Sequence, residues 1–184
     1  RLGIVLMTLS RPPILFSKYI EKRIGGRLKV IRTMPNLPAL VGRSITAVAQ
    51  GRFARKSDLD LACAIFSHLG KSIAVKENLI NAITATSGSG PGYVYFLMEQ
   101  MIAVAEKLGL TEKMATDLVI ETFSGSVHLL KAHGVSPGLL REKVTSKGGT
   151  THAAIEVFTG HKTSRIFDKA LRAAVVRAKK LSRR

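Results

Sequence analysis

Residues 71–92 read KSIAVKENLINAITATSGSGPG, and within this segment the chain changes from alternating strands and helices to helices alone. Its first part, Lys71–Lys76, is a short apolar run that predicts a strand. Its last part carries Pro91, which suits the first position of a long helix. The pattern predicts an α/β domain at residues 1–76 and an all-helical domain at residues 77–184, with the boundary near residues 76–78.

Three further strands and two helices are predicted ahead of this boundary. Gly3–Leu9 is apolar enough for a buried parallel strand, and the helix that follows it is expected to end at Gly25-Gly26. Strands are also expected at residues 28–32 and 46–49, and a helix with Cys63 on its apolar face at residues 59–69. Strands that alternate with helices in this way predict a parallel sheet.

The helical domain is predicted from its capping residues and its apolar faces. Thr111 and Ser136 begin two helices, and Gly109 and Gly134 end the helices before them. The two longest helices carry apolar faces too wide for a domain of this size to bury internally, so we expect a homodimer core. These faces consist of Val94, Leu97, Met98, Met101 and Ile102 on one helix and Leu118, Val119 and Phe123 on the next.

The composition is that of a globular protein with an unusual charge. The 184 residues are 46% hydrophobic, and 29 Lys+Arg against 12 Asp+Glu give a formal net charge of +17. A basic surface can attract nucleic acid, or its charges can simply solvate helix faces; because no nucleic-acid-binding motif is found, the second interpretation is favoured. A single cysteine favours a cytoplasmic protein, no apolar run reaches the roughly 18 residues of a membrane span, and the five histidines show no metal-ligand spacing.

Three segments carry residues suited to ligand binding. Ser87–Gly92 combines glycines and serines ahead of a helix, so its backbone N–H groups can converge on an anion; the alternative is a connector that allows close helix packing. Thr145–Thr151 has hydroxyls and paired glycines at another helix start, which suits a carboxylate or phosphate, or a helix cap formed by Thr150 or Thr151. Met34–Pro38 is a stiff turn after a strand, where ligands of open α/β sheets bind, or a rigid corner.

Taken in their order along the chain, the three motifs resemble the pyrroline-5-carboxylate reductases, which catalyse the last step of proline biosynthesis. The resemblance rests on VIRTMPNLPALVG at residues 30–42, TATSGSGPGY at residues 84–93 and VTSKGGTT at residues 144–151. It implies an α/β domain followed by an all-α domain. The first is part of a Rossmann-type parallel sheet that holds NADH or NADPH. The second is a helical domain that dimerises, often within a decamer.

The resemblance also implies a reaction and a set of site residues. Hydride passes from the nicotinamide to the C=N carbon of 1-pyrroline-5-carboxylate and gives L-proline, so the protein has to orient two rings and bind a carboxylate. The hydroxyl of Thr151 is expected to bond the ring nitrogen as the catalytic group. Substrate binding is expected at Ser146, Gly148, Gly149, Thr150 and Thr151, and cofactor binding at Asn36, Ser87, Gly90, Pro91 and Lys143.

The chain departs from the family pattern at four places. Lys147 stands where the family usually has proline, Lys143 stands where it has Gln or Asn, and Leu9–Pro12 lacks its small Ala-Ala-Gly turn. No glycine-rich phosphate loop follows a strand, so a family member truncated at its start is expected, with weak dinucleotide binding by these residues alone. An active reductase subunit and a non-catalytic dimerisation module of a degenerate paralogue both fit these features.

Overall fold

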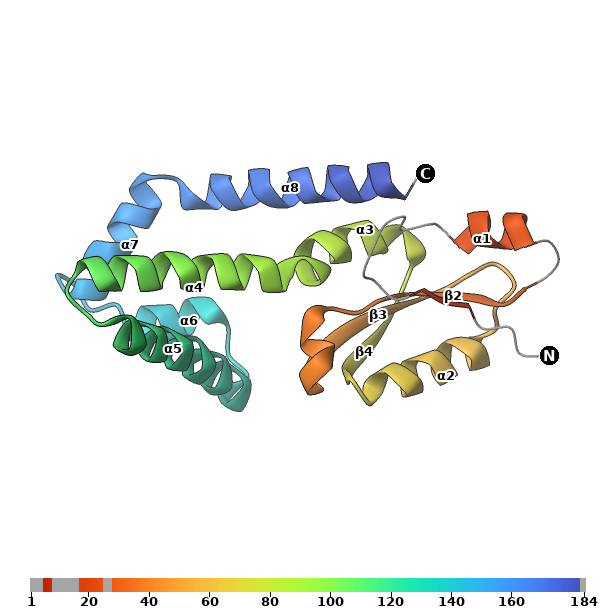
Figure 1. Cartoon of the computed structure of the whole chain (residues 1–184), viewed down its shortest axis with the longest axis horizontal. Coiled ribbons are helices and arrows are strands. Elements are labelled where there is room, and N and C mark those ends of the chain that lie inside the picture. Colours follow the sequence, from red (N-terminus) through yellow and green to blue (C-terminus); the bar gives the residue numbers. More distant parts are fainter. Residues whose placement is uncertain (1–4, 8–16, 25–27, 183–184) are drawn as a thin grey trace. The chain divides into compact units, whose positions relative to one another are not determined.

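The computed structural model describes residues 5–7, 17–24 and 28–182, which form two compact units (Figure 1). Unit 1 contains the described residues up to Tyr93 and those from Lys169 onward, and unit 2 contains Val94–Asp168. Unit 1 extends past the predicted boundary near residues 76–78 because Ile80, which follows that boundary, is buried against the sheet. The division into domains at residues 1–76 and 77–184 stays a prediction.

Unit 1 is built on a four-stranded sheet. The strands lie in the order β1-β2-β3-β4, the order in which they occur in the chain. Their bounds are Val5–Met7 for β1, Val30–Met34 for β2, Ser44–Gln50 for β3 and Gly70–Val75 for β4. Each of the four predicted strands is confirmed. The last three differ slightly at their ends, and the ends predicted for the first, at Gly3 and Leu9, lie outside the described residues.

The prediction of a wholly parallel sheet is wrong for one pair of strands. β1 and β2 are parallel, as are β3 and β4, but β2 and β3 are antiparallel, with Thr33 opposite Val48. Residues 35–43 connect this pair and contain only a 3-10 turn at Leu37–Val41. A parallel crossover needs about a dozen residues or more, so this short connection returns the chain antiparallel to β2.

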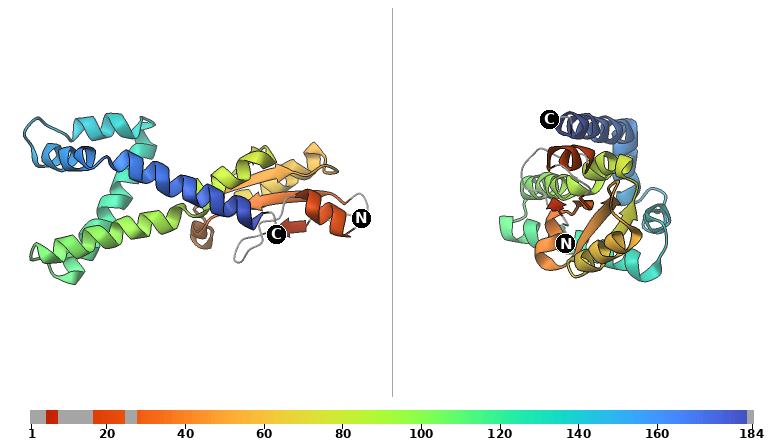
Figure 2. Two further views of the ribbon diagram at one scale, coloured as in Figure 1. Left: turned by 90° about the horizontal axis from the view of Figure 1, so that it is seen from above. Right: turned by 90° about the vertical axis from the view of Figure 1, so that its right-hand side faces the viewer.

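Helices cover both faces of the sheet (Figures 1 and 2). α2, at Lys56–Ser67, packs on one face, and α3, at Ile80–Ile83, packs on the other. The first core cluster consists of Ile31, Val48, Ala54, Ala62 and Phe66, and the second of Met34, Ala47, Ala49 and Ile80. Cys63 packs against the first cluster, in agreement with its predicted place on an apolar helix face.

The helix predicted between the first two strands is confirmed as α1, at Ser17–Ile24. Its expected end signal, Gly25-Gly26, and the expected departure from the family at Leu9–Pro12 lie outside the described residues.

The remaining helices follow the predicted capping residues. They are α4 at Gly90–Lys107, α5 at Glu112–His133, α6 at Pro137–Lys143, α7 at Thr150–Gly160 and α8 at Thr163–Leu181. Thr111 Oγ1 accepts from the Met114 N–H at 3.3 Å, and Ser136 Oγ accepts from the Leu139 N–H at 3.3 Å. Gly134 ends α5 with a left-handed φ of +62°. The caps at Thr111, Ser136 and Gly134 are confirmed.

Unit 2 has little core of its own. Among its hydrophobic side chains, all of them described, only Ala115 and Val119 are buried. Leu118, on the same helix as these two, is 54% exposed, and Met101 is 46% exposed. The wide apolar faces expected from the sequence therefore stay largely uncovered within the chain.

Asp58 ties α2 to the start of β2 and makes stability depend on pH. Its carboxylate accepts from the Arg55 N–H at 2.7 Å and pairs with Lys29 Nζ at 2.9 Å. These contacts, the Arg55 hydrogen bond first, hold the pKa of Asp58 below its usual range.

Because the unfolded chain binds the proton more readily, this stabilisation is complete above about pH 4 and is lost as pH falls below it. Asp58→Asn should lower stability at pH 7 and flatten its decline in acid. Urea unfolding from pH 7 to pH 3 measures both effects, with Asp60→Asn, an exposed aspartate of the same helix, as the control. An acid decline as steep as that of the unchanged protein would contradict this role of Asp58.

Candidate functional site

Asn36 holds the turn after β2 with hydrogen bonds from its side chain and its backbone. Its backbone N–H donates to Ser44 Oγ at 3.4 Å, and its Oδ1 accepts from the Ile45 N–H at 3.2 Å. Because a backbone N–H can only donate, the second contact assigns Oδ1 as the oxygen and directs Nδ2 the other way. Nδ2 donates to Ser87 Oγ at 3.3 Å. Asn36 thus joins two of the three candidate segments.

The segment around Ser87 is a π-helical turn and not the open loop that the sequence predicted. Thr84–Gly88 is π-helical, and the Ser89 N–H donates to the Thr84 carbonyl at 2.8 Å, so this N–H is not available to an anion. α4 begins at Gly90, which makes Pro91 its second residue and not its first. π-Helical turns are rare and often lie at functional sites.

The glycines of this segment have different surroundings. A Cβ at Gly88 would collide with the side chain of Met34, so the π-helical turn packs closely on the end of β2. At Gly90 and Gly92, no described atom lies within 4 Å of where a Cβ would stand. Close packing, the alternative weighed from the sequence, therefore accounts for Gly88 and not for the other two.

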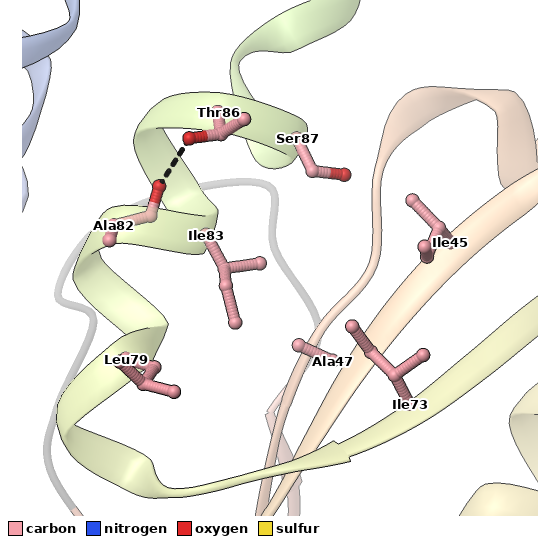
Figure 3. A pocket seen from close by; sticks show the side chains of 8 residues that line it. All are labelled: Ile45, Ala47, Ile73, Leu79, Ala82, Ile83, Thr86 and Ser87. Atoms are coloured by element: carbon pink, nitrogen blue, oxygen red, sulfur yellow. Dashed lines mark hydrogen bonds between the residues drawn. The ribbon is translucent and has the colours of Figure 1, made fainter. Parts of the chain in front are cut away.

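A cavity of about 280 Å³ lies beside Ser87, between α3 with its π-helical turn and the strands β3 and β4 (Figure 3). Thr86 Oγ1 donates to the Ala82 carbonyl at 2.9 Å, while the Ser87 hydroxyl points the other way. The remaining lining is apolar and consists of Ile45, Ala47, Ile73, Leu79, Ala82 and Ile83.

The third candidate segment lies in unit 2, between α6 and α7. Gly148 adopts a left-handed φ of +76°, and the Gly149 N–H donates to the Ser146 carbonyl at 3.0 Å. Gly149 is the N-cap residue of α7, and no side chain caps this helix start. The N–H groups of Thr150 and Thr151 lie in the first turn, where a helix offers no backbone acceptor. With the helix dipole, these groups suit a carboxylate.

The cap formed by Thr150 or Thr151, weighed from the sequence, is wrong. Because the chain is already helical at Thr150, the N-cap falls one residue earlier, on Gly149, which has no side chain to donate or accept. Thr151 is the second helical residue and is half-buried, and the described part of the chain shows no hydrogen bond from its hydroxyl.

The predicted site residues fall into two groups. Asn36, Ser87, Gly90 and Pro91 lie in unit 1, and Ser146, Gly148, Gly149, Thr150 and Thr151 lie in unit 2. Lys143, predicted to bind cofactor, is the exposed last residue of α6 and belongs to the second group.

Metal binding and membrane insertion find no support in the residues that the structure describes. No group of three His, Cys, Asp or Glu side chains there could hold a metal ion. No helix of that part is long and apolar enough to cross a bilayer.

Comparison with known proteins assigns the chain to a family. The profile described as pyrroline-5-carboxylate reductase dimerisation matches residues 77–181, more than half of the chain. The chain belongs to the pyrroline-5-carboxylate reductase family. The match begins within the boundary predicted near residues 76–78.

Reductases of this family resemble the chain well beyond the matched region. The chain is 36% identical to the pyrroline-5-carboxylate reductase of Mycobacterium tuberculosis, over 89% of this chain and 61% of that protein. A solved pyrroline-5-carboxylate reductase from Coxiella burnetii is 37% identical, with a TM-score of 0.88 over 97% of this chain and 66% of that one. A Plasmodium falciparum pyrroline carboxylate reductase solved with NADP bound is 28% identical, with a TM-score of 0.85 over 91% of this chain and 67% of that one. The chain thus spans about half to three fifths of the length of the curated relatives.

Sequence reasoning missed Ser44 and the π-helical turn. Ser44 begins β3, is buried, and bonds both Asn36 and Thr46 through its hydroxyl. A serine between Arg43 and Ile45 carries no signal of such a role. The run TATSGSG at residues 84–90 looks like a loop in sequence because its glycines and hydroxyls favour turns, whereas packing on β2 holds it helical.

Proposed function

We propose that this chain carries the substrate site and part of the cofactor site of a reductase that converts 1-pyrroline-5-carboxylate to L-proline with NADH or NADPH. The observation that carries the proposal is the uncapped start of α7, which follows the Ser146–Gly149 turn in a chain of this family. Its free N–H groups and dipole match the substrate carboxylate, the one anionic group that the protein has to hold.

Substrate binding is assigned to the turn and the first residues of α7. The backbone N–H groups of Thr150 and Thr151 face the carboxylate, whereas the Gly149 N–H is already bonded to the Ser146 carbonyl. The left-handed Gly148 lets the chain approach the carboxylate closely. The hydroxyl of Thr151, which has no hydrogen bond within the described residues, bonds the ring nitrogen. As hydride adds to the ring carbon, that nitrogen gains negative character and takes a proton, so a hydroxyl bonded there stabilises the transition state more than the ground state.

The nicotinamide end of the cofactor is assigned to unit 1. Asn36 and Ser87 are joined there by a hydrogen bond, and the position of a Cβ at Gly90 is free of described atoms. The cofactor, once bound, supplies the hydride. Asn36, Ser87, Gly90 and Pro91 orient the nicotinamide ring. Lys143, which is exposed on α6 of unit 2, adds positive charge for the phosphates of the cofactor.

We place the protein in the cytoplasm and its helical part in a homodimer, which in turn can assemble into a decamer. The uncovered apolar side chains of α4 and α5 and the match to a dimerisation profile support the dimer. Light scattering at micromolar concentration should give twice the mass of the chain or a multiple of it. Leu118→Glu should shift this mass toward the monomer, whereas Lys113→Glu, at an exposed position on the same helix, should not. A stable, folded monomer of the unchanged chain would contradict the proposal.

Thr151→Ala should lower turnover by about ten- to a hundredfold, or about 1.4–2.7 kcal/mol in the barrier. Thr151→Ser keeps the hydroxyl and should keep most of the activity. Since Thr151 is not a cap, the melting temperature should change little. The variants are compared in the 184-residue chain and in a chimera that places the N-terminal part of the Coxiella burnetii reductase before residue 1.

Thr159→Ala is the matched control for Thr151→Ala. Thr159 lies on the same helix, and its hydroxyl donates to the Ile155 carbonyl at 2.8 Å. Its replacement should leave turnover unchanged. Normal turnover of Thr151→Ala would exclude the catalytic role, and a chimera that folds and dimerises without turnover would identify the chain as a non-catalytic dimerisation module.

A further inference from the structure

The orientation of the Ser87 hydroxyl is set by a hydrogen bond from Asn36. A serine hydroxyl can donate one hydrogen bond and accept two. In this structure Ser87 Oγ accepts from Asn36 Nδ2 at 3.3 Å, and Asn36 is itself oriented by the Ile45 N–H on its Oδ1. No other hydrogen bond of Ser87 occurs among the described residues. One of its two acceptor positions is thus filled by Asn36, and its proton is directed away from Asn36.

The neighbouring hydroxyl shows the opposite arrangement. Thr86 also lines the cavity, but its proton is donated to the Ala82 carbonyl (Figure 3). Of the two hydroxyls that line the cavity, that of Ser87 is the one whose proton has no acceptor among the described residues, so it is available to a ligand.

The geometry points to Ser87 as a hydrogen-bond donor to an oxygen acceptor of the bound ligands, with Asn36 as the positioning residue that sets this polarity. The inference rests on the proposed reductase function and adds a role to it. The acceptor is either the carboxamide oxygen of the nicotinamide or a carboxylate oxygen of the substrate. Both are oxygen acceptors that an oriented O–H can recognise.

Asn36→Asp reverses the donor and acceptor roles in the hydrogen bond with Ser87, with almost no change in the shape of the side chain. One oxygen of the introduced carboxylate still accepts from the Ile45 N–H. The other has no proton to donate, so it accepts the proton of Ser87 and leaves the serine facing the ligand with lone pairs. Asn36→Asp should therefore weaken the same step as Ser87→Ala, each by about three- to tenfold, the range of one neutral hydrogen bond.

The test is a double-mutant cycle in the chimera, with kcat, both KM values and the Kd of NADP⁺ and of L-proline as readouts. If Asn36 acts through Ser87, Asn36→Asp should have no further effect once Ser87 is alanine. Thr86→Ala is the matched control and should change each value less than twofold, and Ser87→Thr should retain most of the activity. Melting temperatures show whether each variant is folded.

Thio-NADP⁺ separates the two ligand acceptors, because a thiocarbonyl is a poor hydrogen-bond acceptor. If Ser87 donates to the carboxamide, Ser87→Ala should abolish the preference for NADP⁺ over thio-NADP⁺. If it donates to the substrate, KM for 1-pyrroline-5-carboxylate and Kd for L-proline should rise while that preference persists.

The inference is overturned if Ser87→Ala changes none of these values. It is also overturned if Asn36→Asp behaves like the unchanged protein while Ser87→Ala does not, or if the effects of the two substitutions multiply in the double variant. If the chimera without substitutions binds NADP⁺ or L-proline but shows no turnover, only the proposed function is contradicted. The double-mutant cycle can then still be measured from the Kd values. A chimera that binds neither ligand overturns both.

Discussion

Replacing Glu77 with alanine should lower the free energy of unfolding by about 3–5 kcal/mol, the usual cost of removing one partner from a buried ion pair. Arg32 is 3% exposed, and its Nη1 lies 3.3 Å from Glu77 Oε1. Burial lowers the pKa of Arg32, and the charge and hydrogen bond of Glu77 oppose this effect. Loss of the carboxylate therefore removes a group that offsets the burial of the guanidinium charge.

Glu77 also anchors α1. It accepts from the Ser17 N–H and from Ser17 Oγ, both at 2.7 Å, so a single carboxylate connects the start of α1, β2 and the chain entering α3. Glu77→Gln keeps the shape and loses the charge, and its effect should be smaller than that of alanine.

The control for Glu77 is an ion pair on the surface. Lys113 and Asp117 lie 2.6 Å apart on α5 and are 86% and 61% exposed, so Asp117→Ala should cost about 0.5 kcal/mol or less. Urea unfolding compares the two variants. A loss for Glu77→Ala no larger than that for Asp117→Ala would show that the buried network does not stabilise unit 1.

Gly70→Ala should destabilise unit 1 by at least about 3 kcal/mol, because two separate costs are combined. Gly70 has a φ of +137°, which L side chains rarely adopt, and such strain costs about 1–3 kcal/mol. A Cβ there would also collide with the Ser44 carbonyl and stand 2.5 Å from the Ser44 nitrogen, so the backbone of β3 would have to move. That movement reaches the site, because Ser44 Oγ accepts from the Asn36 N–H.

Gly42→Ala separates the two costs. Gly42 also has a left-handed φ, +66°, but no described atom lies within 4 Å of its Cβ position. Its replacement should cost only the strain of the left-handed backbone conformation, about 1–2 kcal/mol of the free energy of unfolding. Chemical unfolding of both variants measures the difference, and equal losses would mean that the contact with Ser44 contributes nothing.

The sequence predicts the elements of this fold well and their pairing less well. Apolar runs and capping residues such as Thr111 and Ser136 place the strands and helices, because these signals are local. The antiparallel pairing of β2 and β3 follows from the nine-residue connection at residues 35–43, a length constraint that alternation of strands and helices does not express. The π-helical turn depends on contact with Met34, which lies about fifty residues away in the chain.

The same distinction holds for the candidate site. The motif around Gly148 and Gly149 predicts a turn with free N–H groups ahead of a helix, and the structure has such a turn, with the cap one residue earlier than expected. The hydrogen bond between Asn36 and Ser87 joins residues 51 positions apart, and neither residue type signals the other. Local chemistry can be predicted from sequence, whereas the direction of a hydroxyl proton depends on which neighbours the fold supplies.

The central claim is that this chain supplies the substrate site of a pyrroline-5-carboxylate reductase. Its most direct test is NADPH oxidation by the chimera with 1-pyrroline-5-carboxylate, with the product identified by mass spectrometry and the Thr151→Ala variant assayed in parallel. We expect L-proline in proportion to NADPH consumed, and about ten- to a hundredfold less of it from the variant. A folded, dimeric chimera that binds NADPH and yields no L-proline, or whose rate is unchanged by Thr151→Ala, would contradict the account.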